Sequence, residues 1–277
     1  MKRSKGCSRY LVILFSLMVC FVTVFPVYWM LNLSLKKEAD LFMDPPRILP
    51  VNVNLDGYVQ ALGLGTILTW IKNSFSVSLL CVVISLIAAS MAAFALSRFR
   101  YKANNVYIFS ILCTQMIAPA LIVAPAYLLL NRIGLTNTHA GLILVDSGLV
   151  LAFSVWVLKG FFDNIPKEID EAAYIDGCSH GMVFLKIIFP LSIPTIVSVV
   201  LINFFDVYNE YMFATTFLTS KDLWLGTSGI AANTTRIGTN WSITLSQTVM
   251  FCIPPVIFYF VFQRYIVKGM TAGAVKF

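Results

Sequence analysis

The chain has 277 residues, of which 58% are hydrophobic and 12% charged, and its formal net charge is +7. A soluble domain carries about 25% charged residues, so this composition excludes an ordinary soluble enzyme and a disordered protein. The charges lie between long apolar runs, which is typical of a multi-span membrane protein and gives no basic patch for a nucleic acid.

Six segments along the chain carry little or no charge, and each can hold a spanning helix of about 20 residues. A backbone in lipid must satisfy its own hydrogen bonds, which helices of this length do. We therefore predict an all-α, polytopic fold with one membrane domain over residues 1–277. The spans are expected at about residues 10–32, 73–97, 104–128, 138–160, 189–211 and 243–263.

The first segment has the basic start and apolar core of a signal peptide. Its apolar run is longer than about 15 residues and no small-x-small cleavage site follows, so we expect it to be retained as the first span. Residues 36–69 and 219–241, rich in Pro, Gly and Asn, are expected to form compact loops.

Lys and Arg fix the predicted orientation. They are frequent at the N-terminus, after the second span, after the fourth span and in the tail, and sparser in the loops between. Because cytoplasmic loops carry the excess of Lys and Arg, both termini are expected in the cytoplasm.

Polar residues inside the expected spans are Asp146, Asn203, Asp206 and Glu210. An Asp facing lipid at mid-bilayer costs about 2.5–3.5 kcal/mol on insertion scales, so these side chains should face the bundle, a partner or water. One interpretation places them on the substrate path. The other is that they form hydrogen bonds between helices. Pro119, Pro125, Pro254 and Pro255 are expected to mark kinks.

The connection at residues 163–189 is the most informative. Pro166 suits a first helical turn, and the acidic residues that follow favour the helix dipole there. Ile169, Ala172, Ala173 and Asp176 recur at helical spacing and form a small face edged with carboxylates. Gly177 is expected to end this helix and Ser179 to cap a second short one. Such a face could dock on a partner or merely connect two spans.

The motif Glu171-Ala172-Ala173, with Gly177 four residues later and then Ile187 and Pro190, resembles the EAA loop of binding-protein-dependent ABC importer permeases. Cys178 and Phe189 replace the usual Ala and Leu. Three further stretches, at residues 26–36, 73–99 and 263–276, resemble the carbohydrate-uptake branch and its maltose-type G subunit.

This resemblance implies a type I ABC importer permease fold in a bacterial plasma (inner) membrane. It implies that the EAA helix couples to an ABC ATPase, a homodimer or heterodimer, through Glu171, Ala172, Ala173, Asp176 and Gly177. It also implies a tail contact with that ATPase through Gly269, Thr271, Ala272 and Gly273. The other implied partners are a second, maltose-type F-like permease, an external solute-binding protein and a carbohydrate.

Catalysis is not expected on this chain. There is no G-x-x-x-x-G-K-[ST] motif, so ATP and Mg²⁺ are expected on the separate ATPase. The six cysteines and two histidines show no metal-ligand spacing, so no metal or other cofactor is expected. The alternatives are a secondary transporter, which the intramembrane acids would suit, an ABC permease for a non-sugar solute, and a membrane enzyme, for which no catalytic cluster is apparent.

Overall fold

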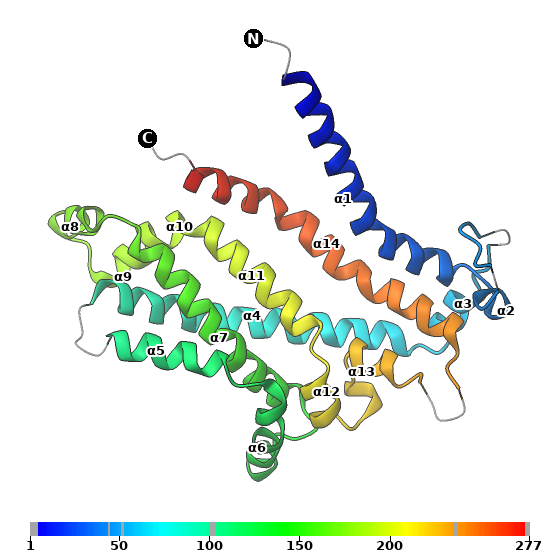
Figure 1. Cartoon of the computed structure of the whole chain (residues 1–277). Helices are drawn as coiled ribbons and strands as arrows, with labels where there is room; N and C mark the ends of the chain where they lie inside the picture. Colours follow the sequence, from blue (N-terminus) through cyan, green and yellow to red (C-terminus); the bar gives the residue numbers. More distant parts are fainter. Residues whose placement is uncertain (1–4, 44, 51–52, 100–103, 235–237, 275–277) are drawn as a thin grey trace. The chain divides into compact units, whose positions relative to one another are not determined.

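The fold of the computed structural model is helical (Figure 1). The structure describes the backbone of residues 5–43, 45–50, 53–99, 104–234 and 238–274. Within these ranges no β-strand forms. The helices are α1 (Lys5–Ser34), α2 (Glu38–Leu41), α3 (Asp56–Gly63), α4 (Thr66–Arg98), α5 (Asn104–Gln115), α6 (Pro119–Arg132), α7 (His139–Asp163), α8 (Lys167–Ile175), α9 (His180–Val183), α10 (Phe189–Leu191), α11 (Ile193–Tyr208), α12 (Met212–Phe217), α13 (Gly226–Ala231) and α14 (Trp241–Ala274). A π-helical turn covers Phe184–Ile188 and a 3-10 turn covers Lys221–Leu223.

Four of these helices, α1, α4, α7 and α14, are each long and apolar enough to cross a membrane. Two further candidates are bent pairs. Helices α5 and α6 meet at 98°, and the segment His180–Leu191 meets α11 at 75°. Pro119 opens α6 and Pro194 lies in the first turn of α11, where the missing proline N–H is tolerated. The expected third and fifth spans, at 104–128 and 189–211, therefore each contain a bend.

The chain divides into two compact units. Unit 1 consists of residues 1–68 and 230–253, and unit 2 of residues 69–229 and 254–277. In unit 1 the segment after α1 folds back on the end of that helix. The Asn32 side chain donates to the Ile48 carbonyl at 2.9 Å, and the Lys36 ammonium donates to the Arg47 carbonyl at 2.6 Å. The expected loop at 36–69 thus contains helices α2 and α3 and is tied to α1.

Unit 2 has two buried apolar clusters. The first joins α4, α7, α8 and α11 through residues such as Ala93, Leu158, Ala173 and Val199. The second joins α4, α6, α7 and α11 to α12 and includes Phe217. Within this unit, α8, α9 and α10 lie at one end of the long helices, and α6 and α12 lie at the other (Figure 1). The two ends of unit 2 are therefore separated by the membrane-length helices.

Small side chains form a buried stripe along α4, beside larger buried residues such as Val77 and Phe94. Its members recur every three or four residues, so they form one stripe along the helix. They are Ser74, Ser78, Cys81, Ser85, Ala89, Ala93 and Ser97. Small residues allow close approach between membrane helices, where packing replaces the hydrophobic effect as the main attraction.

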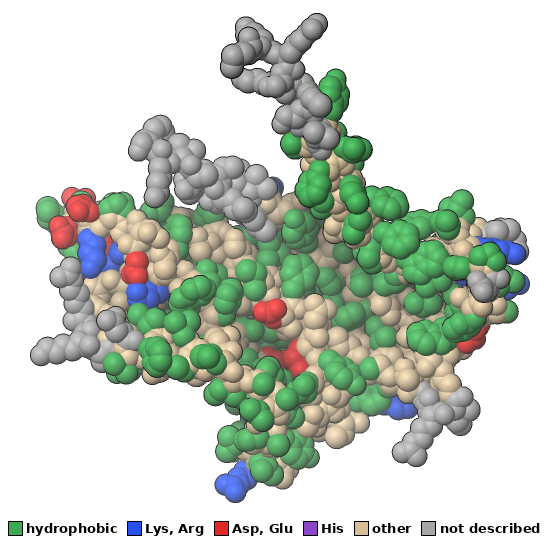
Figure 2. Space-filling model, in the orientation of Figure 1, with side chains coloured by type: hydrophobic (Ala, Val, Ile, Leu, Met, Phe, Trp, Pro, Cys, Tyr) green, Lys and Arg blue, Asp and Glu red, His purple; other side chains and the backbone are tan. Residues whose placement is uncertain are grey.

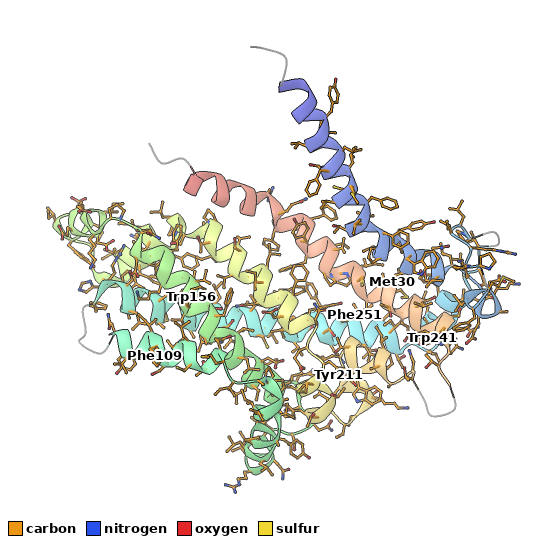
Figure 3. All side chains as sticks on the ribbon, viewed as in Figure 1. Met30, Phe109, Trp156, Tyr211, Trp241 and Phe251 are labelled. Carbon is orange, nitrogen blue, oxygen red and sulfur yellow. The ribbon has the colours of Figure 1, made fainter. Side chains whose placement is uncertain are left out.

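Large apolar side chains elsewhere remain exposed. The most apolar window of α1 has no buried residue, and Phe109 on α5 and Trp156 on α7 are 69% and 50% exposed (Figure 3). Surfaces of this kind belong in contact with lipid or with another apolar subunit.

Candidate functional site

A sharp corner joins α8 to α9, as the sequence predicts. Gly177 has a φ of +85°, a conformation that suits glycine because it has no Cβ. The Cys178 N–H donates to the Ala173 carbonyl at 2.9 Å, and the Gly177 N–H donates to the Tyr174 carbonyl at 3.0 Å. This hydrogen-bond pair is a Schellman motif, which satisfies the last carbonyls of α8.

The second helix of the corner also begins as predicted. The Ser179 hydroxyl accepts a hydrogen bond from the Met182 N–H at 3.4 Å and caps α9. The Tyr174 hydroxyl is 2.7 Å from Nδ1 of His180, which joins α8 to α9 across the corner. Burial and then the charge of Asp170 raise the pKa of Tyr174 above its usual value near 10.0, so its hydroxyl keeps its proton at neutral pH.

Helix α8 has one buried and one exposed side. Asp170 and Ala173 are buried, and Ala173 packs in the first apolar cluster. The opposite side is open, and its side chains are Glu168, Ile169, Glu171, Ala172, Ile175 and Asp176. Ile175 is 87% exposed. The face expected from the sequence is therefore divided, because Ala173 faces the chain's own core while Ile169, Ala172 and Asp176 remain available to a partner.

A buried ion pair anchors α8 to the membrane helices. Nε of Arg98, in the last turn of α4, pairs with Oδ2 of Asp170, and both side chains are 5% exposed. The same guanidinium donates to the carbonyls of Phe162 at 2.9 Å and Ile165 at 3.3 Å, at the end of α7. One side chain thus links α4, α7 and α8.

The corner at Gly177 supports a stability prediction. A Cβ at this position would meet no atom within 4 Å, so a substitution is opposed only by the positive φ. Gly177→Val should lower the free energy of unfolding by about 1–2 kcal/mol, and Gly177→Asn by less, because Asn tolerates this conformation. Thermal unfolding of the purified protein measures both effects.

Gly181 provides the matched control, since a Cβ there also meets no atom within 4 Å and its φ is not in the left-handed region. Gly181→Val should change the free energy of unfolding by no more than about 0.5 kcal/mol. Equal destabilisation by the two valines would show that backbone strain at Gly177 is not the cause.

Three of the four intramembrane polar residues line one cavity. Asp146 on α7, Asp206 on α11 and Glu210 just beyond it border a space of about 330 Å³. Asp146 is 2% exposed, and neither of its carboxyl oxygens has a hydrogen-bond partner among the described residues. Figure 2 shows acidic side chains surrounded by hydrophobic ones on the face in view.

The fourth residue, Asn203, lies outside the cavity lining. It is fully buried, and its side-chain amide donates to the Ser154 hydroxyl at 2.7 Å, so it joins α11 to α7. Glu210 has a structural contact as well. Its carboxylate accepts from the Phe213 and Ala214 N–H groups at 2.6 and 2.8 Å and caps α12.

The tail residues Gly269, Thr271, Ala272 and Gly273 lie on the last turns of α14. Side chains from residue 265 onward, and all of residues 275–277, lie outside the described part of the structure. In the part that is described, no group of three or more His, Cys, Asp or Glu side chains is placed to hold a metal ion.

Arg98 and Asp170 are the site residues that the sequence does not reveal. In the sequence, Arg98 is one of the basic residues that indicate orientation, and Asp170 is one of several acidic residues in a first helical turn. Their burial could have been anticipated only from helical spacing, which puts Asp170 on the same side of α8 as Ala173 and opposite Glu168.

Comparison with known proteins gives a consistent result over the whole chain. A family model described as "Binding-protein-dependent transport system inner membrane component" matches residues 1–272. The trehalose/maltose transport system permease protein MalG of Thermococcus litoralis is 31% identical over 277 residues, which cover 99% of each chain. The diacetylchitobiose uptake system permease protein DasC of Streptomyces coelicolor is 31% identical over 260 residues, 91% of this chain and 92% of that one.

A solved structure is similar as well. A chain of a bacterial ABC transporter that imports the acidic polysaccharide alginate superposes with a TM-score of 0.80 at 21% sequence identity. The match covers 96% of this chain and 98% of the other. At this sequence identity the similarity shows a common fold and does not indicate the transported solute.

Proposed function

The chain belongs to the family of binding-protein-dependent transport system inner membrane components, and we propose that it is the permease subunit of an ABC importer for a carbohydrate. As a member of this family it is a transport subunit of the inner membrane and not an enzyme. The sugar assignment is supported by its relatives, whose names specify trehalose/maltose, diacetylchitobiose and arabinooligosaccharides at 30–31% identity.

The proposed topology has six spans with both termini in the cytoplasm. Four continuous helices and two bent pairs supply candidates for this number. The Lys and Arg distribution supports this orientation, in which α8 would lie on the cytoplasmic side. The bent pairs fit a transport subunit, since a break in a spanning helix is tolerated where it lies against protein or a water-filled path.

The observation that carries the proposal is the arrangement of α8. The helix presents Glu171, Ala172 and Asp176 to the outside, while its buried side is held to α4 and α7 by Arg98. A helix that is free on one side and rigidly attached on the other can pass a partner's movement into the membrane. We assign that partner as an ABC ATPase, a homodimer or heterodimer, which would hold ATP and Mg²⁺.

The tail is proposed as the second ATPase contact. Residues Gly269, Thr271, Ala272 and Gly273 continue α14 beyond the sixth span expected from the sequence, which ends at about residue 263. A helix that extends past the hydrocarbon core is in a position to reach a cytoplasmic subunit.

The substrate path is proposed to run past the cavity that Asp146, Asp206 and Glu210 line. Asn203 is left out of this path, because it is buried and bonded to Ser154. A second homologous permease, F-like in the maltose-type systems, would complete the pore, and an external solute-binding protein would deliver the sugar.

Energy dependence tests the proposal. In proteoliposomes that contain the full importer, we expect sugar uptake to require ATP inside the lumen and to stop with a non-hydrolysable analogue. Collapse of the proton and sodium gradients should leave the initial rate unchanged. Uptake that needs an ion gradient and no ATP would identify a secondary transporter and refute the proposal.

A further inference from the structure

Helix α6 turns sharply away from the helix before it. Helix α5 is tied to two spanning helices, because the Asn104 amide donates to the Leu96 carbonyl of α4 at 3.0 Å and the Gln115 amide donates to the Leu149 carbonyl of α7 at 3.1 Å. The chain bends by 98° between α5 and α6, and Figure 1 shows α6 running across the direction of α4 and α5. Since α5 lies along a spanning helix, α6 lies close to the membrane plane.

The length of α5 places this bend near the far surface of the hydrocarbon core. Helix α5 begins beside the end of α4 that carries Arg98, which pairs with α8. Its 12 residues rise by about 18 Å, and residues 116–118 can add up to about 10 Å. The hydrocarbon core is about 30 Å thick. The chain therefore comes close to the surface opposite α8 before α6 begins.

Both sides of α6 are apolar, and only one of them is covered by this chain. Ala126 and Leu130 are buried in the second apolar cluster, on the side that faces α12. The other side carries Leu121, Leu128 and Leu129, which are 61% to 72% exposed. A row of large exposed apolar side chains marks contact with lipid or with another protein.

The size of the open side chains and their surroundings favour lipid. Membrane helices that pack on one another present small residues at the contact, as Ala126 does on the covered side, whereas the open side presents leucines. Residues 114–121 are all exposed, so the open side of α6 continues from the outer surface of α5 without a break.

Arg132, in the last turn of α6, also suits a lipid surface. It is exposed, and no ion pair joins it to an acidic side chain within the described ranges. In a protein interface this charge would need an acidic partner. At a membrane surface the long side chain reaches the lipid phosphates while the helix remains lower in the bilayer.

We propose that α6 is an interfacial helix, which lies in the plane of the membrane at the surface opposite α8 and buries Leu121, Leu128 and Leu129 among lipid acyl chains. Helices of this kind lie about 5–10 Å inside the headgroup boundary. The third span then consists of α5 and the connection after it, and is shorter than the span expected at 104–128. The proposal depends on the membrane location of the chain and does not depend on the transported solute.

Spin labels that report depth test this placement. Leu121→Cys and Leu128→Cys are labelled one at a time in the full importer in proteoliposomes, after its native cysteines have been replaced. Collision rates with oxygen and with a water-soluble nickel chelate give the depth of each label. Leu80→Cys and Ile87→Cys are the matched controls, because they have the same seven-residue spacing and are 50% and 57% exposed on the continuous helix α4.

We expect the two labels on α6 to differ in depth by less than about 4 Å, because both lie on a helix parallel to the membrane surface. The two labels on α4 should differ by about 10 Å, the rise of seven residues along a spanning helix. Oxygen collisions should be as frequent on α6 as on α4. If Leu128→Cys does not assemble, Leu129→Cys replaces it.

A depth difference near 10 Å on α6, equal to that on α4, would show that α6 crosses the membrane and would overturn the proposal. Rare collisions with both reagents would show that a protein surface covers the helix. Frequent collisions with the nickel chelate would place it in water, and each of these two results also overturns the lipid assignment. ATP-driven uptake is recorded on the same proteoliposomes. Its absence counts against the importer function, whereas the depth profile alone decides the position of α6.

Discussion

Replacing Asp170 by Asn is expected to reduce ATP-driven uptake by about tenfold or more. The free energy of unfolding should fall by about 3–5 kcal/mol, because the substitution leaves the buried charge of Arg98 without its partner. Arg98, which would be left unpaired, is 5% exposed and also holds two carbonyls at the end of α7. Removing the carboxylate therefore weakens the attachment of α8 and leaves the Arg98 guanidinium without a counter-ion in a site shielded from water.

Two further variants separate anchoring from general damage. Arg98→Lys keeps the charge but loses the planar fork, so we expect an intermediate loss of uptake. Asp163→Asn breaks the exposed Lys159–Asp163 pair on α7, where the atoms are 2.5 Å apart, and should change stability by no more than about 0.5 kcal/mol.

The decisive measurement is the amount of ATP hydrolysed per sugar transported. If Arg98 and Asp170 only stabilise the fold, the folded fraction of Asp170→Asn should keep the wild-type ratio. A ratio that rises several-fold in fully assembled complexes would show that the ion pair transmits the movement of α8. An unchanged ratio would leave it a purely structural contact.

Replacing Glu171 by Lys is expected to weaken binding of the ATPase to the permease pair by about 10- to 100-fold, because a charge on the docking face is reversed. Glu171 is exposed, and it has no hydrogen-bond or ion-pair partner in the part of the chain that the structure describes. The free energy of unfolding should therefore change by no more than about 0.5 kcal/mol, so the loss appears in binding and uptake.

Asp222→Lys makes the same charge change at another exposed residue, in the 3-10 turn after α12. This turn lies at the end of unit 2 opposite α8, and the variant should leave ATPase affinity unchanged. Equal weakening by both variants would attribute the effect to net charge. Normal ATPase affinity and normal uptake with Glu171→Lys would show that Glu171 does not contact the ATPase.

Local features of the fold could be predicted because their causes are local. Charge-free length predicts the membrane helices, and positive φ at Gly177 and the cap at Ser179 follow from the residue types themselves. The 98° bend between α5 and α6 could not be predicted in this way. Both halves are apolar, so hydropathy is the same for a straight span and a bent one.

The site was predictable only in part, because burial depends on distant contacts. Asp170 and Glu171 are adjacent acids in one helical turn, yet one pairs with Arg98 of α4 and the other faces outward. Asn203 and Asp206 are one turn apart on α11, yet only Asp206 lines the cavity. In each case the sequence gives the residue type and its spacing, and the neighbouring helices decide its role.

The buried face of α4 has a consequence for motion. Its serines and alanines project little from the helix, so they form shallow ridges where leucine or phenylalanine would interlock with a neighbour. Interlocked side chains must change rotamer before two helices can slide, whereas smooth surfaces permit small shear displacements at low cost. We therefore expect small shear displacements along this stripe, while larger buried residues of α4 such as Val77 and Phe94 keep the neighbouring helices in contact.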